Sequence, residues 1–83
     1  MEMFEVVNYE TDTKVLVCPN MTIGSTCLNY IVEVYDKQYF TMWNRQGSRW
    51  SRKPYHTEIV SAEMLDSRLE RWVSKEAHRF ILV

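Results

Sequence analysis

The sequence predicts an α+β domain in which an antiparallel sheet of four or five strands carries one C-terminal helix on one face. Residues 3–60 contain short runs of β-branched and aromatic residues that alternate between two faces, as strands do. Residues 62–77 instead place apolar side chains at helical spacing. The chain has 83 residues, which suits a single compact domain over residues 1–83.

The first two strands are predicted at residues 3–9 and 13–18, with the polar residues 10–12 as the turn of a hairpin. Pro19 is expected to end the second strand, because proline has no N–H to donate to a ladder. Residues 19–28 then form the longest connection in the chain.

The next two strands are predicted at residues 29–35 and 38–43, because both runs are aromatic or β-branched and only residues 36–37 separate them. A connection of two residues is typical of a tight hairpin. Residues 44–48 are predicted to form a turn in which Gly47 adopts a positive φ.

The remaining segments before and after the helix are less regular. Residues 49–53 fit either a fifth strand or a loop, and Pro54 ends whichever of the two forms. Residues 56–60 are short and ambiguous. At residues 79–83, three consecutive aliphatic residues favour a short last strand over an extension of the helix.

We expect a helix over residues 62–77, with Ser61 as its N-cap. Its apolar residues fall at i, i+4, i+7 and i+8 and therefore share one face: Leu65, Leu69, Trp72 and Val73. This face is expected to pack against valines of the sheet, namely Val6, Val15, Val17, Val32 and Val34.

Membrane and secreted classes do not fit the composition. No apolar run exceeds four residues, whereas a membrane-spanning helix needs about 20. The N-terminal residues carry no basic stretch followed by an apolar one, so we expect a cytoplasmic protein with no membrane partner. Two cysteines are fewer than a small secreted scaffold carries, so Cys18 and Cys27 are expected to be reduced thiols rather than a disulfide.

The residues that catalysis or metal binding would need are sparse. The histidines His56 and His78 and the two cysteines lie at least nine positions apart, whereas zinc ligands usually come in close pairs. No nucleophile–base pair or phosphate-binding loop is recognisable. We therefore expect no enzyme activity, no catalytic residue, no metal and no cofactor.

Charge is strongly segregated, although the formal net charge is only −1. Residues 1–36 contain six acids and one base, residues 37–56 contain five bases and no acid, and residues 57–83 are close to balance. A basic segment of this kind favours an acidic partner surface or a polyanion.

The basic segment overlaps a run, residues 43–56, that interleaves four cations with two tryptophans and a tyrosine. Arginine binds carboxylates and phosphates, while tryptophan and tyrosine anchor interfaces or stack on bases. Trp43 is expected in the core and Trp50 partly exposed. The candidate partner-binding residues are Arg45, Arg49, Trp50, Arg52, Lys53 and Tyr55. The alternative is a solvated hairpin with no binding role.

A second candidate surface is the sheet face that the helix leaves uncovered. Aromatic residues fall on both faces of the hairpin predicted at residues 29–43. One helix covers only one face, so we expect an apolar patch around Tyr35, Tyr39 and Phe40. Such patches usually mark interfaces.

In size, predicted fold class and lack of a known family motif, the chain resembles the small inhibitors that phages encode, anti-CRISPR proteins among them. The resemblance extends over the whole chain in general character and rests on no motif, so no residue role follows from it. It implies a protein that acts by occluding a macromolecular partner. The strongly acidic members of that group, which imitate DNA, differ from this chain in net charge.

The leading hypothesis is a non-enzymatic protein-binding module or inhibitor whose partner is a protein with an acidic surface or a nucleoprotein enzyme. The alternative is a single-stranded nucleic-acid-binding domain, in which Trp50 and Tyr55 stack on bases and the arginines hold phosphates. Opposite charges on residues 1–36 and 37–56 add the hypothesis of a symmetric homodimer.

Overall fold

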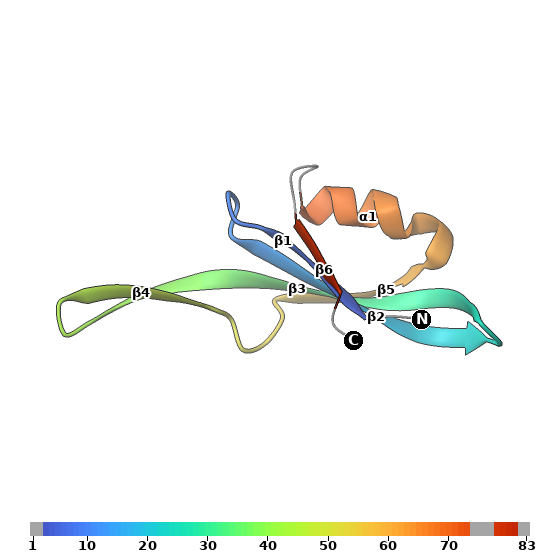
Figure 1. Cartoon of the computed structure of the whole chain (residues 1–83), viewed down its shortest axis with the longest axis horizontal. Coiled ribbons are helices and arrows are strands. Elements are labelled where there is room, and N and C mark those ends of the chain that lie inside the picture. Colours follow the sequence, from blue (N-terminus) through green and yellow to red (C-terminus); the bar gives the residue numbers. More distant parts are fainter. Residues whose placement is uncertain (1–2, 74–77, 82–83) are drawn as a thin grey trace.

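Antiparallel strands and one helix make up the fold, and the structure, a computed structural model, describes residues 3–73 and 78–81 (Figure 1). The elements in chain order are β1 (Phe4–Asn8), β2 (Thr13–Ile23), β3 (Thr26–Met42), β4 (Arg45–Trp50), β5 (His56–Ser61), the 3-10 helix η1 (Ala62–Met64), α1 (Leu65–Trp72) and β6 (His78–Ile81). Five of the described strands form the main sheet in the order β5–β3–β2–β1–β6, while β4 pairs with the second half of β3. The predicted α+β class is confirmed.

The predicted first hairpin forms, with Val6 of β1 opposite Val15 of β2. Its turn is closed by the buried Asn8, whose Oδ1 accepts hydrogen bonds from the backbone N–H groups of Glu10 and Thr11, at 2.9 and 3.2 Å. Asparagine favours turns because its short side chain bonds to the backbone two or three residues on.

The connection predicted for residues 19–28 is wrong, because β2 continues to Ile23 and forms a second hairpin with β3. Gly24, at φ 61°, lies in the turn, where a left-handed backbone suits glycine. Pro19 is tolerated inside β2 because the ladder shifts register between Pro19 and Met21. Proline within a sheet is usually found at such a bulge or at an edge.

The hairpin predicted across residues 36–37 is also wrong. β3 runs unbroken for 17 residues, and the turn to β4 lies at Trp43 and Asn44, at φ 53° and 61°. Two consecutive residues at positive φ are the signature of the hairpin turn whose twist matches that of its strands. Asp36 instead accepts a hydrogen bond from the backbone N–H of Ser51, at 2.8 Å.

The structure decides the conformation of the segments for which the sequence left two alternatives. Residues 51–55 connect β4 to β5, and β5 pairs with the first half of β3. Gly47 lies within β4, not in a turn as predicted. β6 pairs with β1 and confirms a last strand over the described residues 78–81, while residues 82–83 of that prediction lie outside the described range.

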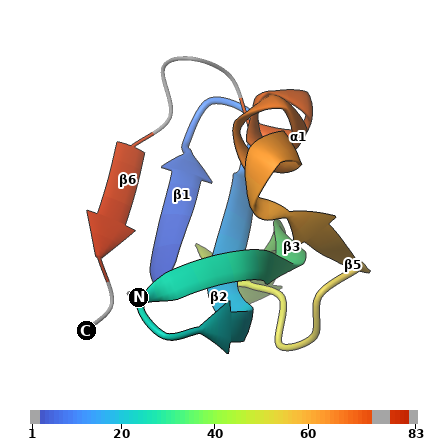
Figure 2. The same ribbon diagram turned by 90° about the vertical axis from the view of Figure 1, so that its right-hand side faces the viewer.

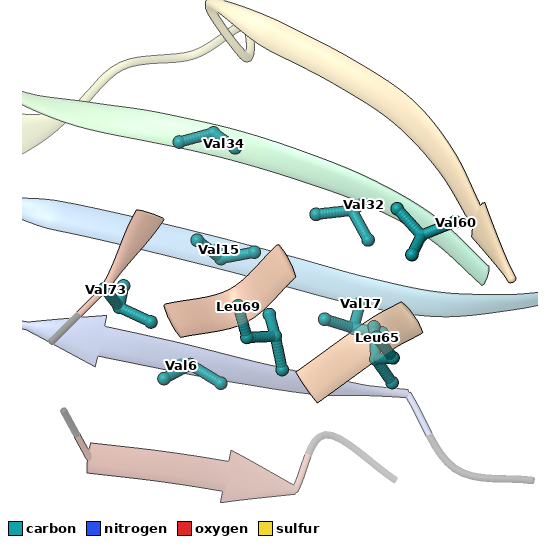
Figure 3. Packing of buried hydrophobic residues seen from close by; sticks show 9 residues of the cluster. All are labelled: Val6, Val15, Val17, Val32, Val34, Val60, Leu65, Leu69 and Val73. Carbon is teal, nitrogen blue, oxygen red and sulfur yellow. The ribbon is translucent and has the colours of Figure 1, made fainter. Parts of the chain in front are cut away.

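The core lies between α1 and one face of the main sheet (Figure 3). Leu65 and Leu69 of the helix and the following Val73 are buried in it, and Trp72 packs against it while partly exposed. The sheet contributes the five predicted valines and one more, listed together as Val6, Val15, Val17, Val32, Val34 and Val60. The predicted helix face and its partners are confirmed.

The helix is shorter than predicted, because α1 ends at Trp72 and Val73 has an extended backbone at φ −132° and ψ 143°. A β-branched residue favours this conformation. Residues 74–77 of the predicted helix lie outside the described residues. Ser61 does precede η1 in an extended conformation, but its side chain makes no capping hydrogen bond.

The second half of β3 and all of β4 extend beyond the main sheet as a two-stranded ribbon, residues 37–50, which we call the arm (Figure 1). β2 accompanies β3 only as far as Thr13, which lies opposite Asp36. The arm therefore contributes to an elongated molecule of 53 × 22 × 21 Å.

We predict that Leu69→Asp unfolds the protein, because Leu69 is buried between helix and sheet and a carboxylate there has no partner. The loss should be at least about 3 kcal/mol, a large share of the roughly 5–15 kcal/mol that stabilises a typical domain. Thermal unfolding followed by circular dichroism measures it. Ser67→Asp adds the same charge on the exposed side of α1 and should unfold within a few degrees of the wild type. Equal stability of the two variants would contradict the packing.

Candidate functional site

The register of the arm assigns its side chains to two faces, because residues directly opposite each other in an antiparallel pair lie on the same side. The first, which we call the arginine face, carries three pairs: Gln38 and Arg49, Phe40 and Gly47, Met42 and Arg45. The second, the tryptophan face, carries three others: Lys37 and Trp50, Tyr39 and Ser48, Thr41 and Gln46.

On the arginine face, the ring of Phe40 lies directly over Gly47. A Cβ atom at Gly47 would stand 2.6 Å from the ring's Cζ, so only glycine leaves room for the ring there. The guanidinium carbon of Arg49 lies 5.7 Å from the centroid of the same ring, within range of a cation–π contact. Phe40 is therefore held flat along the arm while it stays exposed.

The end of the arm is its most apolar part. Trp43 is 89% exposed and Met42 is 57% exposed. They border an open hollow of about 510 Å³ lined by Phe40, Met42, Trp43, Arg45, Gln46 and Gly47. The expectation that Trp43 belongs to the core is wrong, because Trp43 lies in the turn at the end of the arm, away from the main sheet.

The tryptophan face attaches the arm to the main sheet. The ammonium of Lys14 lies 5.0 Å from the ring centroid of Tyr35 and 5.4 Å from that of Trp50. The ammonium of Lys37 also lies 5.4 Å from the Trp50 centroid, and it lies 6.0 Å from that of Tyr9. We call these five residues the cation–π base of the arm. Trp50 is partly buried, as predicted, but its ring contacts lysines of its own chain.

Two tyrosines near this base have raised pKa values. Burial raises the pKa of Tyr35, and the neighbouring Glu33 carboxylate raises it further. The hydroxyl of Tyr39 donates a hydrogen bond to Asp12, and this bond raises the pKa of Tyr39. Both phenols are therefore neutral hydrogen-bond donors at ordinary pH. The bond from Tyr39 joins the arm to the turn of the first hairpin.

The six predicted binding residues do not form one surface. Arg45 and Arg49 share the arginine face, while Trp50 points to the opposite face. Arg52, Lys53 and Tyr55 lie in the connection between β4 and β5, where the Tyr55 ring meets Trp72 edge-on at 6.2 Å. The structure instead groups the two arginines with three residues that the prediction omitted: Phe40, Met42 and Trp43. In the sequence, only Asn44 indicates that these residues belong together. Asparagine readily adopts a positive φ, so it marks the turn at the end of the arm, next to which they lie.

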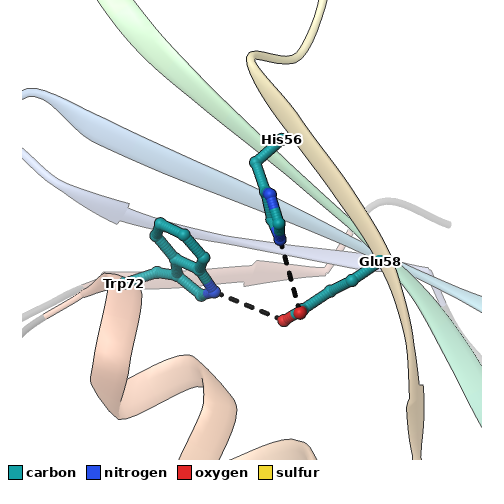
Figure 4. A network of polar contacts seen from close by, with 3 residues as sticks. All are labelled: His56, Glu58 and Trp72. Carbon is teal, nitrogen blue, oxygen red and sulfur yellow. Dashed lines mark hydrogen bonds and ion pairs between the residues drawn. The ribbon is translucent and has the colours of Figure 1, made fainter.

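A separate polar network joins β5 to the end of α1 (Figure 4). His56 Nε2 lies 3.3 Å from Glu58 Oε2, and Trp72 Nε1 donates to Glu58 Oε1 at 3.4 Å. The ring centroids of His56 and Trp72 lie 4.8 Å apart, and the ring planes are tilted by 35°. Burial by itself raises the pKa of the Glu58 carboxyl, but the hydrogen bonds from His56 and Trp72 and the charge of Arg68 together lower it below its usual value.

The cysteines lie apart in the second hairpin. Cys18 is opposite Ile31, four residues along β3 from Cys27, so the register places the pair beyond the reach of a disulfide. Cys27 is buried and its thiol donates to the carbonyl of Asn29 at 3.1 Å. Burial raises the pKa of Cys18, and the charge of Glu33 raises it further, so this thiol is not set up as a nucleophile.

In the part of the chain that the structure describes, no group of three or more His, Cys, Asp or Glu side chains could hold a metal ion. No helix among residues 3–73 and 78–81 is long and apolar enough to cross a membrane. Comparisons with models of protein families, with curated proteins and with solved structures found no match.

We predict that Phe40→Leu moves the α-proton resonances of Gly47 downfield, because the aromatic ring that lies over Gly47 is lost. Two-dimensional NMR of the labelled protein measures the shift. Tyr39→Leu removes a ring from the opposite face of the same strand and should leave the Gly47 resonances in place. Unchanged Gly47 resonances in Phe40→Leu would show that the ring does not cover the glycine.

We predict that Glu58→Gln makes the melting temperature depend less on pH under acidic conditions. The folded-state pKa of Glu58 is lowered, so its ionised form stabilises the fold at neutral pH, and this contribution is lost as the pH falls through that pKa. The melting temperature of the wild type should therefore fall more steeply than that of the variant between about pH 5 and pH 3. Glu70→Gln, an exposed change on α1, is the control. Identical slopes for wild type and Glu58→Gln would contradict the lowered pKa.

Proposed function

We propose that this chain is a non-enzymatic, cytoplasmic protein-binding module that inserts its arm into an acidic groove of a protein partner. The observation that carries the proposal is Trp43, almost fully exposed at the end of a ribbon that is fixed at its base. An exposed tryptophan has a large apolar surface in water and is the residue type most often found as an interface anchor.

The surroundings of Trp43 support a protein partner. Phe40 and Met42 extend the apolar surface, and Arg45 and Arg49 border it. Aromatic residues, methionine and arginine are the residues enriched at protein interfaces, where a desolvated apolar centre is ringed by polar groups. An arm that fills a groove in this way excludes other ligands, which is the action of an inhibitor.

Charge supports an acidic partner surface. Residues 37–56 contain five bases and no acid. Lys37 is engaged with Trp50 and Tyr9, which leaves Arg45 and Arg49 as the exposed cations of the arm. Guanidinium groups on either side of an apolar centre fit carboxylates at the rim of a groove, and this arrangement steers association.

The alternative of single-stranded nucleic-acid binding has less support. It requires Trp50 and Tyr55 to stack on bases beside the arginines. Trp50 instead contacts Lys14 and Lys37 on the face opposite Arg45 and Arg49, and Tyr55 contacts Trp72. Arg45 and Arg49 therefore line no common groove with the two expected stacking residues.

The test is site-specific crosslinking with a photoreactive phenylalanine analogue at position 43 of the full chain. The variant is irradiated in a lysate of the cells that make the protein, and the crosslinked species is identified by mass spectrometry. We expect one protein adduct that survives nuclease treatment. The same analogue at position 71, on the exposed side of α1, is the control and should give no such adduct.

We predict that Trp43→Asn lowers the affinity for the captured, purified protein about thirtyfold or more, because truncating a central aromatic anchor costs about 2 kcal/mol. Asparagine accepts positive φ more readily than tryptophan, so the turn and the melting temperature should be preserved. Isothermal titration calorimetry measures the affinity. An adduct with nucleic acid, equal adducts at positions 43 and 71, or unchanged affinity of Trp43→Asn would each overturn the proposal.

A further inference from the structure

The face of the main sheet opposite α1 carries an apolar patch bordered by carboxylates. The sheet curls, and α1 packs on the side that carries the buried valines (Figure 2). Side chains alternate along a strand, so the residues between those valines point to the other side. We call six of them the acidic patch: Glu5, Leu16, Cys18, Ile31, Glu33 and Ile59.

The acidic patch is ordered in two rows across the strands. In one row Leu16 lies between Glu5 and Glu33, so the two carboxylates are two strands apart, about 10 Å. In the next row Ile31 lies between Cys18 and Ile59. The patch therefore has apolar residues at its centre, and in the first row a glutamate lies on each side of Leu16.

This surface differs from the usual solvated face of an antiparallel sheet, which is polar. Ile59 is 66% exposed, and Leu16 and Ile31 are half-buried. Within residues 3–73 and 78–81, no helix covers this face. Among the side chains of residues 3–73, neither Glu5 nor Glu33 forms an ion pair, and Glu33 accepts a hydrogen bond from the Tyr35 hydroxyl at 3.3 Å. An apolar centre bordered by carboxylates is typical of a surface that binds a partner.

The end of the arm has the complementary arrangement. It presents Trp43, Met42 and Phe40 beside two guanidinium groups, with the pair Phe40 and Gly47 between Arg45 and Arg49. Arg45 and Arg49 are four residues apart on one strand, about 14 Å, a separation that flexible side chains can match to the 10 Å between the two carboxylates. The charges are opposite, and each surface has an exposed apolar residue, Trp43 on the arm and Ile59 on the patch.

The arm cannot reach the acidic patch of its own chain. β3 is continuous from Thr26 to Met42, so Phe40 and Met42 point to the same side of the strand as Val32 and Val34, the side that α1 covers. The arginine face is thus turned away from the patch, and the arm also extends away from the main sheet (Figure 1). Contact between the two surfaces requires two molecules.

We propose that the arm of one copy docks on the acidic patch of a second copy. Two copies related by a twofold axis make this contact twice, which closes the assembly as a dimer. Because the dimer covers the end of each arm, self-association and partner binding are mutually exclusive. The dimer is then a stored form of the protein that a partner must dissociate.

Sedimentation velocity of the full chain over a range of concentrations, at about 50 mM and about 500 mM salt, tests this proposal. We expect a dimer whose dissociation constant rises with salt, because opposite charges hold the contact. Arg45→Glu with Arg49→Glu should weaken the dimer at least tenfold. Adding Glu5→Arg and Glu33→Arg to the same chain exchanges every charge of the contact and should restore the dimer.

Two controls separate the contact from general effects of charge and folding. Arg52→Glu with Lys53→Glu makes the same change of net charge in the connection after β4 and should leave the dimer intact. Trp43→Asn changes no charge and should also weaken the dimer at least tenfold, which keeps the test valid if the exchanged variant fails to fold.

The outcomes distinguish this proposal from the function proposed above. A monomer at every concentration, or a dimer that is unaffected by the arm variants, overturns it, even if position 43 crosslinks to a different protein. A dimer weakened by the arm variants supports it. If position 43 then crosslinks only to a second copy of this chain, the result supports the proposed dimer and overturns the proposed partner-binding function.

Discussion

The continuity of β3 is the constraint on which the remaining structure depends. Its first half pairs with β2 on one edge and β5 on the other, and its second half pairs with β4. Without a turn at residues 36–37, the strand leaves the main sheet and becomes one side of the arm. The same continuity determines which face each side chain of the arm occupies, because a shift of one residue would exchange the two faces.

An isolated two-stranded ribbon is only marginally stable in water, so the arm needs its attachment. Trp50 contacts Lys14 and Lys37, and Tyr39 bonds to Asp12 in the turn of the first hairpin. These contacts use the tryptophan face and leave the arginine face uncovered. The arm is therefore fixed on one side and exposed on the other, with Trp43 held at a positive φ that is unfavourable for a bulky residue.

The two candidate surfaces follow from one feature of the sheet. A single short helix covers one face of a five-stranded sheet, and apolar residues such as Leu16 and Ile31 remain on the other. The sequence already indicated such an uncovered face, but it placed that face around Tyr35 and Tyr39, which the structure assigns to the attachment of the arm and its surroundings. The segregation of charge visible in the sequence becomes an acidic sheet face and a basic arm.

The sequence by itself determined the fold class, the first hairpin, the helix face and the valines that it covers, because each depends on a local period of apolar residues or on a side chain bonding to nearby backbone. Only the tertiary structure decided where β3 turns and that Trp43 is exposed. The position of the turn depends on how β3 pairs with β2 and β5, which are distant from that turn in the sequence. An aromatic residue such as Trp43 fits the sequence pattern of a core and that of an exposed ribbon end equally well.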